Sequence, residues 1–342
     1  MKAAVLHAID DLRIENVPTP TLIKGEEACI IKINAAGVCG SDISRVFKDG
    51  TYSFPLIPGH EFAGEIIETG NNCPYKIGQI AAIYPLLPCR KCPSCLEQRF
   101  QQCDSYNYFG SRCDGGFAEY IKVPYWNIVP APDGVSAAEA ALCEPASVAQ
   151  HGMRNVKVTT GDSVLIFGAG AIGLMMAQWA FIFGASNVVL ADISNDKLNA
   201  GRKIVPDAEY INSMETSIEE VLKDRKFNVA VEGTGAPAIY QQVIKFTAKN
   251  GRILLLGNPS KDVLIERSIV SQLLRKELTI HGTWNSTLEP YNEWAATLQA
   301  ISESKLNVKN MITHRYQLDD ALKALHMMRE GKTFFNRVIL DI

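Results

Sequence analysis

Four cysteines in a short segment have the spacing of a metal-binding loop. They follow the pattern Cys-x2-Cys-x2-Cys-x7-Cys and stand at Cys89, Cys92, Cys95 and Cys103. Four thiolates can close a tetrahedral zinc–sulfur shell within one loop, and such a shell leaves no position open for a substrate. Free thiols or disulfides are the alternatives, and a reducing compartment disfavours disulfides. We therefore predict a structural zinc site in this segment.

A glycine-rich turn follows the predicted strand Val164–Phe167 and opens a predicted helix. It matches the pattern G-x-G-x-x-G at Gly168, Gly170 and Gly173, with Ile172 inside it. In such a turn the first glycine makes the bend, the second lets the backbone approach a pyrophosphate, and the third lets helix and strand pack closely. The free N–H groups and the dipole of the helix N-terminus favour the anion. These residues predict a dinucleotide site.

An acidic residue at the end of the next predicted strand supports the dinucleotide site. Asp192 lies close to the spacing of about 20 residues at which a carboxylate accepts hydrogen bonds from the ribose hydroxyls. A carboxylate there repels a 2′-phosphate, so the sequence favours NAD over NADP. Lys197 is a candidate for covering the edge of the adenine ribose.

Three dispersed residues form a candidate for a second, open metal site. His60 sits in a predicted turn before a strand, Cys39 lies within Gly37–Asp42, and Glu144 lies where the texture of the sequence changes. A cysteine, a histidine and a carboxylate leave the fourth position of a zinc ion open to water or substrate, as catalysis requires. Each residue alone has an ordinary structural explanation, and only their combination indicates a catalytic zinc.

The elements around these motifs indicate two domains. The first 140 residues contain short β-like runs separated by Gly, Pro and Asn, which favours a β-rich domain, whereas strands and helices alternate after about residue 150, as in parallel α/β sheets. Near the end of the sequence, Leu318–Arg329 reads as a helix and Arg337–Asp341 as a strand that could join either domain. The β-like runs are Cys29–Ala35, Glu61–Glu68, Gln79–Tyr84 and Ala118–Val123.

Length and composition agree with a soluble globular protein. The chain has 342 residues, 47% of them hydrophobic and 21% charged, and a net charge of −3 without a basic block for nucleic acid or anionic lipid. No apolar run reaches the roughly 18 residues of a membrane span, and the first residues do not form a secretory signal. We therefore expect a cytoplasmic protein that binds neither nucleic acid nor a membrane.

The motifs together resemble the zinc-containing alcohol dehydrogenases of the medium-chain dehydrogenase/reductase superfamily. The resemblance covers essentially the whole chain and implies a Rossmann doubly wound parallel sheet plus a GroES-like β-rich catalytic domain. We expect the catalytic domain at 1–145 with a zinc lobe at about 85–105, the NAD-binding domain at 146–285, and a segment at 286–342 that returns to the first domain. The matching motifs are Gly59–Gly64 with Gly70 and Cys73, Gly40–Asp42, Cys89–Cys103, Asp114–Tyr120 and Gly168–Gly173.

The resemblance also implies roles for the residues of the catalytic site. Cys39, His60 and Glu144 would hold the zinc, with Glu61 either a direct ligand or one that exchanges with water. Asp42 matches the carboxylate that orients the zinc-bound histidine, and Ser41 matches a hydroxyl that relays the substrate proton. Many relatives have a histidine five residues after the cysteine, where this chain has Ser44.

A glutamate at position 144 resembles the polyol branch, because simple alcohol dehydrogenases of the family have cysteine there. Pro85–Cys89, Phe109–Arg112 and Leu274–Leu278 resemble the galactitol-1-phosphate 5-dehydrogenases, which convert the phosphorylated polyol to L-tagatose 6-phosphate with NAD. D-arabitol-phosphate dehydrogenases are similar. A phosphate requires cations or backbone N–H groups, and the candidates are Arg45, Lys48 and Arg112.

Other functions remain open at this stage. The same scaffold suits dehydrogenases of unphosphorylated polyols such as sorbitol, or of L-threonine. A zinc-free quinone reductase would not need Cys39, His60 and the four-cysteine lobe, and a non-enzymatic NAD-binding protein would not need Ser41 and Glu144 as well. We expect a homodimer or homotetramer, by analogy with family dimers that pair near Leu278–Trp284.

Overall fold

The computed structural model describes residues 1–342, and the chain divides into two compact units. The first unit contains Met1–Ser147, Thr287–Ser304 and Val308–Ile342, and the second contains Val148–Ser286 and Lys305–Asn307. The division falls inside α4 (Cys143–Asn155). Lys305–Asn307 differs from the expected return of 286–342 to the first domain, because the Asn307 N–H donates to Gln178 Oε1 of the second unit at 2.6 Å.

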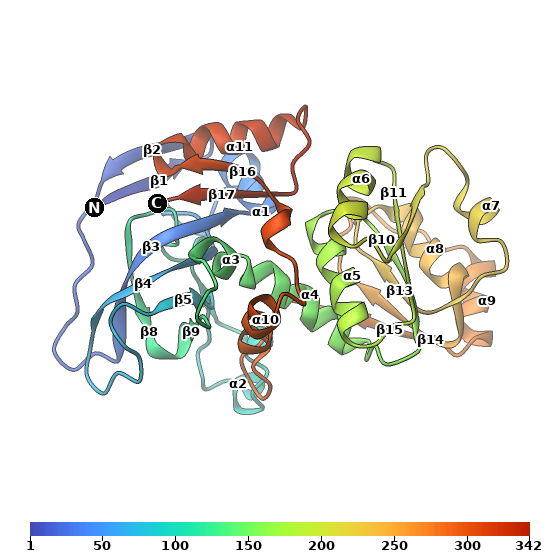
Figure 1. Ribbon diagram of the computed structural model, residues 1–342, viewed down its shortest axis with the longest axis horizontal. Coiled ribbons are helices and arrows are strands. Elements are labelled where there is room, and N and C mark those ends of the chain that lie inside the picture. The colour runs from blue at the N-terminus through green and yellow to red at the C-terminus, as the bar shows by residue number, and fades with distance from the viewer. The chain divides into compact units, whose positions relative to one another are not determined.

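The second unit is built on a six-stranded parallel sheet with the order β12-β11-β10-β13-β14-β15. The order reverses between β10 and β13, as in doubly wound nucleotide-binding folds. Figure 1 shows α5 (Ala171–Ile182) and α6 (Asn195–Ile204) on one face of this sheet and α8 (Pro237–Phe246) and α9 (Arg267–Arg275) on the other. The strands are β10 (Ser163–Phe167), β11 (Asn187–Asp192), β12 (Glu209–Asn212), β13 (Phe227–Glu232), β14 (Thr247–Leu255) and β15 (Thr279–Gly282).

The inner strands of this sheet are continuous apolar runs because helices cover both faces. Val164–Phe167 and Val188–Ala191 are buried throughout, and the core continues into the face of α8 through Val243 and Ile244. Each strand ends at the same edge of the sheet, which is where nucleotides bind in such folds. The predicted Rossmann fold is confirmed.

The first unit is built on a seven-stranded sheet that contains the strand nearest the end of the chain. The order is β16-β17-β3-β4-β5-β9, with β8 also paired to β3, and the β16–β17 pair is the parallel one. The strands of this sheet are β3 (Ala28–Val38), β4 (Glu61–Thr69), β5 (Ile80–Ile83), β8 (Tyr120–Pro124), β9 (Ile128–Pro130), β16 (Ile312–Gln317) and β17 (Arg337–Asp341). Two small two-stranded sheets accompany it. One pairs β1 (Lys2–Ala8) with β2 (Asp11–Asn16), and the other pairs β6 (Leu86–Leu87) with β7 (Asn107–Tyr108).

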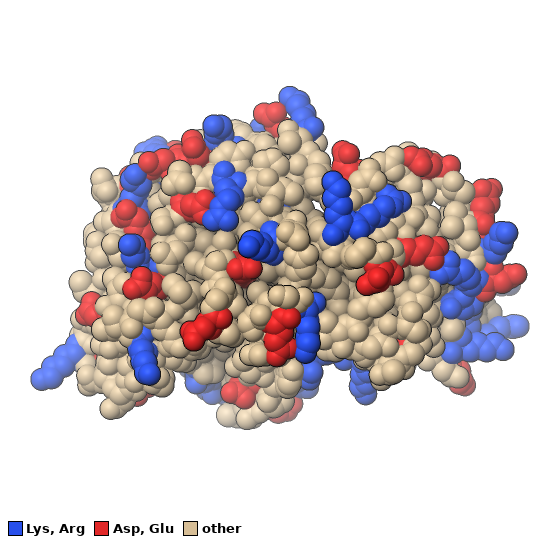
Figure 2. Space-filling view, in the orientation of Figure 1, with Lys and Arg blue, Asp and Glu red and all other residues tan.

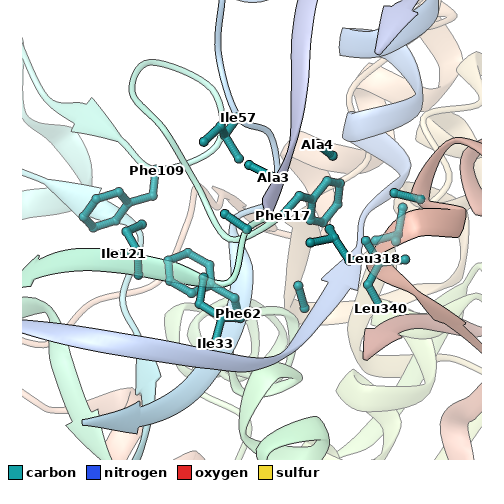
Figure 3. Close-up of a cluster of buried hydrophobic side chains, with 14 of the residues drawn as sticks. Ala3, Ala4, Ile33, Ile57, Phe62, Phe109, Phe117, Ile121, Leu318 and Leu340 are labelled. Carbon is teal, nitrogen blue, oxygen red and sulfur yellow. The ribbon is translucent and has the colours of Figure 1, made fainter. Parts of the chain in front are cut away.

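The core of the first unit joins segments from both ends of the sequence. Ala3 and Phe117 pack with Phe62 and Ile33, while Leu318 and Leu340 come from the last part of the chain (Figure 3). The edge strand β16 alternates between half-buried and exposed side chains, as expected when one face meets solvent. The β-rich architecture confirms the predicted class of this unit.

Charge is mixed on the surface. Figure 2 shows Lys and Arg side chains interspersed with Asp and Glu side chains over the face in view. None of the helices combines the length and the apolar character needed to cross a bilayer.

Candidate active site

Strand pairing brings Cys39, His60 and Glu61 together. Gly37 of β3 lies opposite Glu61 at the start of β4 in the antiparallel register, so the chain leaves β3 beside the point where it enters β4. Cys39 then caps the short helix α1 (Gly40–Ser44). The candidate ligand atoms of Cys39, His60 and Glu61 all lie within 4.8 Å of one another.

The donor atoms of this group fit a zinc ion. Asp42 is fully buried, and its Oδ1 lies 3.4 Å from His60 Nδ1, which leaves Nε2 of the imidazole for a metal. Asp42 Oδ2 accepts the Cys39 backbone N–H at 2.9 Å, so one carboxylate fixes both neighbours. Burial opposes ionisation of the Cys39 thiol, but the adjacent His60 brings its pKa down to about 6, towards the thiolate that binds metals.

Glu144 lies outside the close group of Cys39, His60 and Glu61, and Tyr108 connects it to that group. It stands in the first turn of α4, where Tyr108 Oη donates to its Oε1 at 3.3 Å. The Tyr108 ring centre lies 5.9 Å from that of His60. Burial raises the pKa of Glu144 to about 7.

Arg337 is a buried cation that the sequence analysis did not identify. It stands at the start of β17 and forms an ion pair with Glu61 Oε2. Burial lowers the pKa of its guanidinium. A Cβ on Gly37 would come within 2.2 Å of Glu61 Oε2 and 3.2 Å of Arg337 Nη2, which explains the glycine there. Arg337 follows Glu61 by 276 residues in the sequence, and no motif marks it.

Ser41 and Arg45 form a hydrogen-bonded pair beside Asp42. Arg45 Nη1 donates to Ser41 Oγ at 2.8 Å and to Asp42 Oδ1 at 2.9 Å, and the Arg45 side chain is 22% exposed. The guanidinium, predicted as a phosphate contact, is thus engaged with residues next to the candidate metal ligands.

Lys48 and Arg112, the other two predicted phosphate contacts, have different surroundings. Lys48 is exposed in the helical turn Arg45–Asp49. The Arg112 guanidinium lies between two aromatic rings, 4.2 Å from the centroid of Tyr52 and 4.2 Å from that of Tyr106, and donates to Tyr52 Oη at 3.1 Å. Tyr106 in turn packs edge-on against Tyr108. Arg112 is therefore linked to His60 by three successive contacts, through Tyr106 and Tyr108.

The four-cysteine lobe forms the second candidate metal site. The Sγ atoms of Cys89, Cys92, Cys95 and Cys103 all lie within 4.8 Å of one another, around the short helix α2 (Pro93–Leu96). None of the nine cysteines forms a disulfide. Hydrogen bonds from the backbone N–H groups of Lys91 and Cys92 lower the pKa of Cys89 to about 6. Four converging sulfurs of this kind fit a tetrahedral zinc ion.

The glycine turn lies between β10 and α5. Gly168 has φ of 107°, a backbone conformation that favours glycine, and a Cβ on Gly173 would come within 1.9 Å of the Gly168 carbonyl oxygen. Gly170 caps α5 with open space at its Cβ position. Ile172 is partly buried in the first turn of α5. The turn is thus closed towards the sheet and open at Gly170, where a pyrophosphate would approach.

Asp192, the last residue of β11, is hydrogen-bonded to this turn. Its Oδ2 accepts the Ala169 N–H at 2.8 Å and its Oδ1 accepts the Ser194 N–H at 2.9 Å. Lys197 Nζ lies 3.8 Å from Oδ2. Each carboxylate oxygen has a second lone pair, so Asp192 can still accept hydrogen bonds from ribose hydroxyls.

Comparison with known proteins matches both units to described families. The family model of the alcohol dehydrogenase GroES-like domain matches residues 25–133, and that of the zinc-binding dehydrogenases matches residues 171–303. Galactitol 1-phosphate 5-dehydrogenase of Escherichia coli (strain K12) is 33% identical over 332 residues, which cover 95% of each chain. Sorbitol dehydrogenase of Bacillus subtilis (strain 168) is 30% identical, covering 97% of this chain and 94% of the relative. The crystal structure of galactitol-1-phosphate dehydrogenase from Escherichia coli superposes with a TM-score of 0.92 at 32% identity and covers 100% of both chains.

Proposed function

The chain belongs to the zinc-containing alcohol dehydrogenase family, and from that premise we propose that it oxidises a secondary hydroxyl of a phosphorylated polyol to a ketose phosphate with NAD. Galactitol 1-phosphate, converted to L-tagatose 6-phosphate, is the substrate we favour. The class of enzyme, a zinc-dependent dehydrogenase acting on CH–OH groups, follows from the family itself.

One observation carries the choice of a phosphorylated substrate. The Arg112 guanidinium is held between Tyr52 and Tyr106, and its contacts lead through Tyr108 to His60. Its Nη1 donates to the Tyr106 carbonyl oxygen and its Nη2 to Tyr52 Oη, each at 3.1 Å. Three of the five N–H groups of the guanidinium are left for a phosphate. The whole path lies within the first unit. We propose that Arg112 binds the substrate phosphate while the reacting hydroxyl lies at the zinc, with the exposed Lys48 as a second contact.

The residues of the candidate active site have separate roles in the proposed reaction. We propose that Cys39, His60 and Glu144 hold the catalytic zinc. Glu61 would become a zinc ligand when its ion pair with Arg337 breaks. Bound zinc supplies the Lewis acidity that lowers the pKa of a hydroxyl, and NAD supplies the hydride acceptor. Asp42 orients His60, and Ser41 Oγ accepts the proton of the substrate hydroxyl.

The cofactor residues act through the backbone and one carboxylate. The N-terminus of α5 and the open side of Gly170 receive the pyrophosphate, and Asp192 accepts the adenosine ribose hydroxyls. Lys197, beside Asp192, lies at the edge of that ribose. The Asp192 carboxylate would repel a 2′-phosphate, so we expect a preference for NAD.

A substrate panel tests the proposed function. The zinc-loaded protein is assayed by NADH absorbance with galactitol 1-phosphate, D-arabitol phosphate, galactitol, sorbitol and L-threonine, and with NADP in place of NAD. We expect kcat/KM to be at least about 100-fold higher with the phosphate than without it, because charged hydrogen bonds contribute about 1.5–3 kcal/mol each. Equal or faster turnover of free sorbitol or L-threonine would show that the substrate is not a phosphate ester.

A substitution of Arg112 tests the phosphate contact separately. For Arg112→Met we expect KM for the phosphorylated polyol to rise about 10- to 100-fold, the cost of one or two lost charged hydrogen bonds. The kcat/KM for the unphosphorylated polyol should stay within about 2-fold of the wild type. Arg99→Met is the matched control, because Arg99 pairs with Glu97 on the surface. A parallel loss on both substrates would refute a phosphate-specific role for Arg112.

We also propose that two copies of the chain pair through the edge strand β15. This strand ends the six-stranded sheet, with Ile280 44% exposed, and Trp284 beyond it is 61% exposed. The neighbouring helix α9 has no buried residue, and Leu274 on it is 70% exposed. Unpaired strand edges and apolar patches favour association with a second copy. Sedimentation of the wild type and Ile280→Lys is expected to give a dimer and a monomer, respectively, and a monomeric wild type would exclude this pairing.

A further inference from the structure

We propose that Arg45 is a positioning residue that sets the direction of the Ser41 proton, rather than a contact for the substrate phosphate. The inference rests on the proposed function in one respect, namely that Ser41 receives the proton of a secondary hydroxyl. It does not depend on whether the substrate carries a phosphate.

The contact between the two side chains fixes which of them donates. A guanidinium has N–H groups and no acceptor, so Arg45 Nη1 is the donor in its 2.8 Å hydrogen bond to Ser41 Oγ. A serine hydroxyl has one proton and two lone pairs. Arg45 takes one lone pair and forces the hydroxyl proton to point elsewhere. What remains on Oγ is one lone pair and one proton, which is what a group needs to accept one proton and pass on another.

Asp42 holds Arg45 in this orientation. The same nitrogen, Nη1, lies 2.9 Å from Asp42 Oδ1, and Asp42 is fully buried. Its other oxygen accepts the Cys39 N–H, and Oδ1 also faces His60 Nδ1 at 3.4 Å. The Asp42 carboxylate therefore connects the proposed proton acceptor, through Arg45, with the ligands of the proposed zinc site.

The local chain geometry makes the contact a direct consequence of the sequence. The helix α1 continues without a break into the turn Arg45–Asp49, and Arg45 itself has φ of −61° and ψ of −45°. Residues three and four apart lie on one face of a helix, so Arg45 lies over Ser41 and Asp42. Ser44, which stands where many relatives have histidine, immediately precedes Arg45 in the chain. Arg45 is thus the charged group that this chain places on Ser41.

A double-substitution cycle tests the proposal. The variants are Arg45→Met, Ser41→Ala and the two combined, assayed with phosphorylated and unphosphorylated secondary alcohols and with zinc content measured. For Arg45→Met we expect kcat to fall about 10- to 100-fold on both classes of substrate, because positioned proton transfer contributes about 10²–10⁴-fold to rate. KM and zinc content should stay near those of the wild type. In the Ser41→Ala background, Arg45→Met should have almost no further effect, since residues that act as a unit are non-additive.

Two further readouts separate positioning from structural support. The solvent deuterium isotope effect on kcat is expected to increase in Arg45→Met, because proton transfer becomes slower relative to the other steps, and Arg45→Lys should recover part of the lost rate. Arg13→Met is the matched control, because Arg13 forms an ion pair with Asp11 on the surface of the same unit.

Several outcomes would overturn the proposal. A rise in KM confined to phosphorylated substrates would assign Arg45 to the phosphate. An equal loss of kcat with and without Ser41 would show that the two residues act independently. Loss of zinc from Arg45→Met would show a structural role through Asp42 or through His60, whose Nδ1 lies 3.4 Å from Arg45 Nη1. If the wild type prefers unphosphorylated alcohols, the phosphate part of the proposed function fails, and the cycle still decides the role of Arg45 on those alcohols.

Discussion

His60→Ala is expected to lose one of two bound zinc ions per chain and to lower kcat at least about a thousand-fold. His60 supplies the imidazole of the proposed catalytic site, and its Nδ1 is held by Asp42. Lewis-acid activation by zinc contributes several kcal/mol, and each 1.4 kcal/mol changes a rate tenfold. Metal content by mass spectrometry and kcat from NADH absorbance give the two readouts.

Cys92→Ser provides the comparison for the other zinc site. Cys92 belongs to the four-cysteine group and not to the group around His60. We expect this variant to lose one zinc ion as well, but through the lobe, so that the folded fraction keeps its kcat while thermal stability falls. If His60→Ala retained both zinc ions, or if Cys92→Ser abolished kcat in folded protein, the assignment of the two sites would be wrong.

Gly173→Ala is expected to abolish NAD binding and to destabilise the second unit. The added Cβ would lie 1.9 Å from the Gly168 carbonyl oxygen, and this contact is with the backbone, which cannot move without opening the turn. Overpacking of this kind costs about 1–3 kcal/mol or more. Thermal unfolding and NADH fluorescence titration measure the two effects.

Gly170→Ala is the matched control because it separates binding from folding. Gly170 has φ of −74°, and nothing lies within 4 Å of its Cβ position. We therefore expect an unchanged unfolding temperature without cofactor and a large loss of NAD affinity, since the methyl group would occupy the space through which the pyrophosphate approaches. Normal NAD affinity in Gly170→Ala would place the cofactor elsewhere.

The sequence predicted best the features that are local in the chain. The apolar run Val164–Phe167, the following glycines and Asp192 lie within one βαβ unit, so their types and spacing nearly define the geometry. The four cysteines likewise share one loop. Strand limits were less accurate: the run predicted as Gln79–Tyr84 forms the strand Ile80–Ile83.

Contacts made by distant segments were not predictable from one sequence. Arg337 meets Glu61 only because β17 pairs with β3 next to Gly37, and nothing in the local sequence encodes that register. Tyr108 reaches Glu144 from a two-residue strand that no periodicity reveals. Arg45 was interpreted by its charge and its nearness to a motif, whereas its partners depend on the helical path from Ser41.

The pairing of β17 with β3 has a consequence for folding during translation. Residues Ala35–Val38 of β3 pair with Val338–Asp341, which are synthesised about 300 residues later. At about 5–20 residues per second, roughly 15–60 s separate the two strands during translation. Throughout that interval this apolar stretch of β3 has an open edge, and open edges recruit other chains. We expect nascent chains to need a holdase until Asp341 emerges, and the ion pair between Arg337 and Glu61 at the proposed zinc site to form only after that.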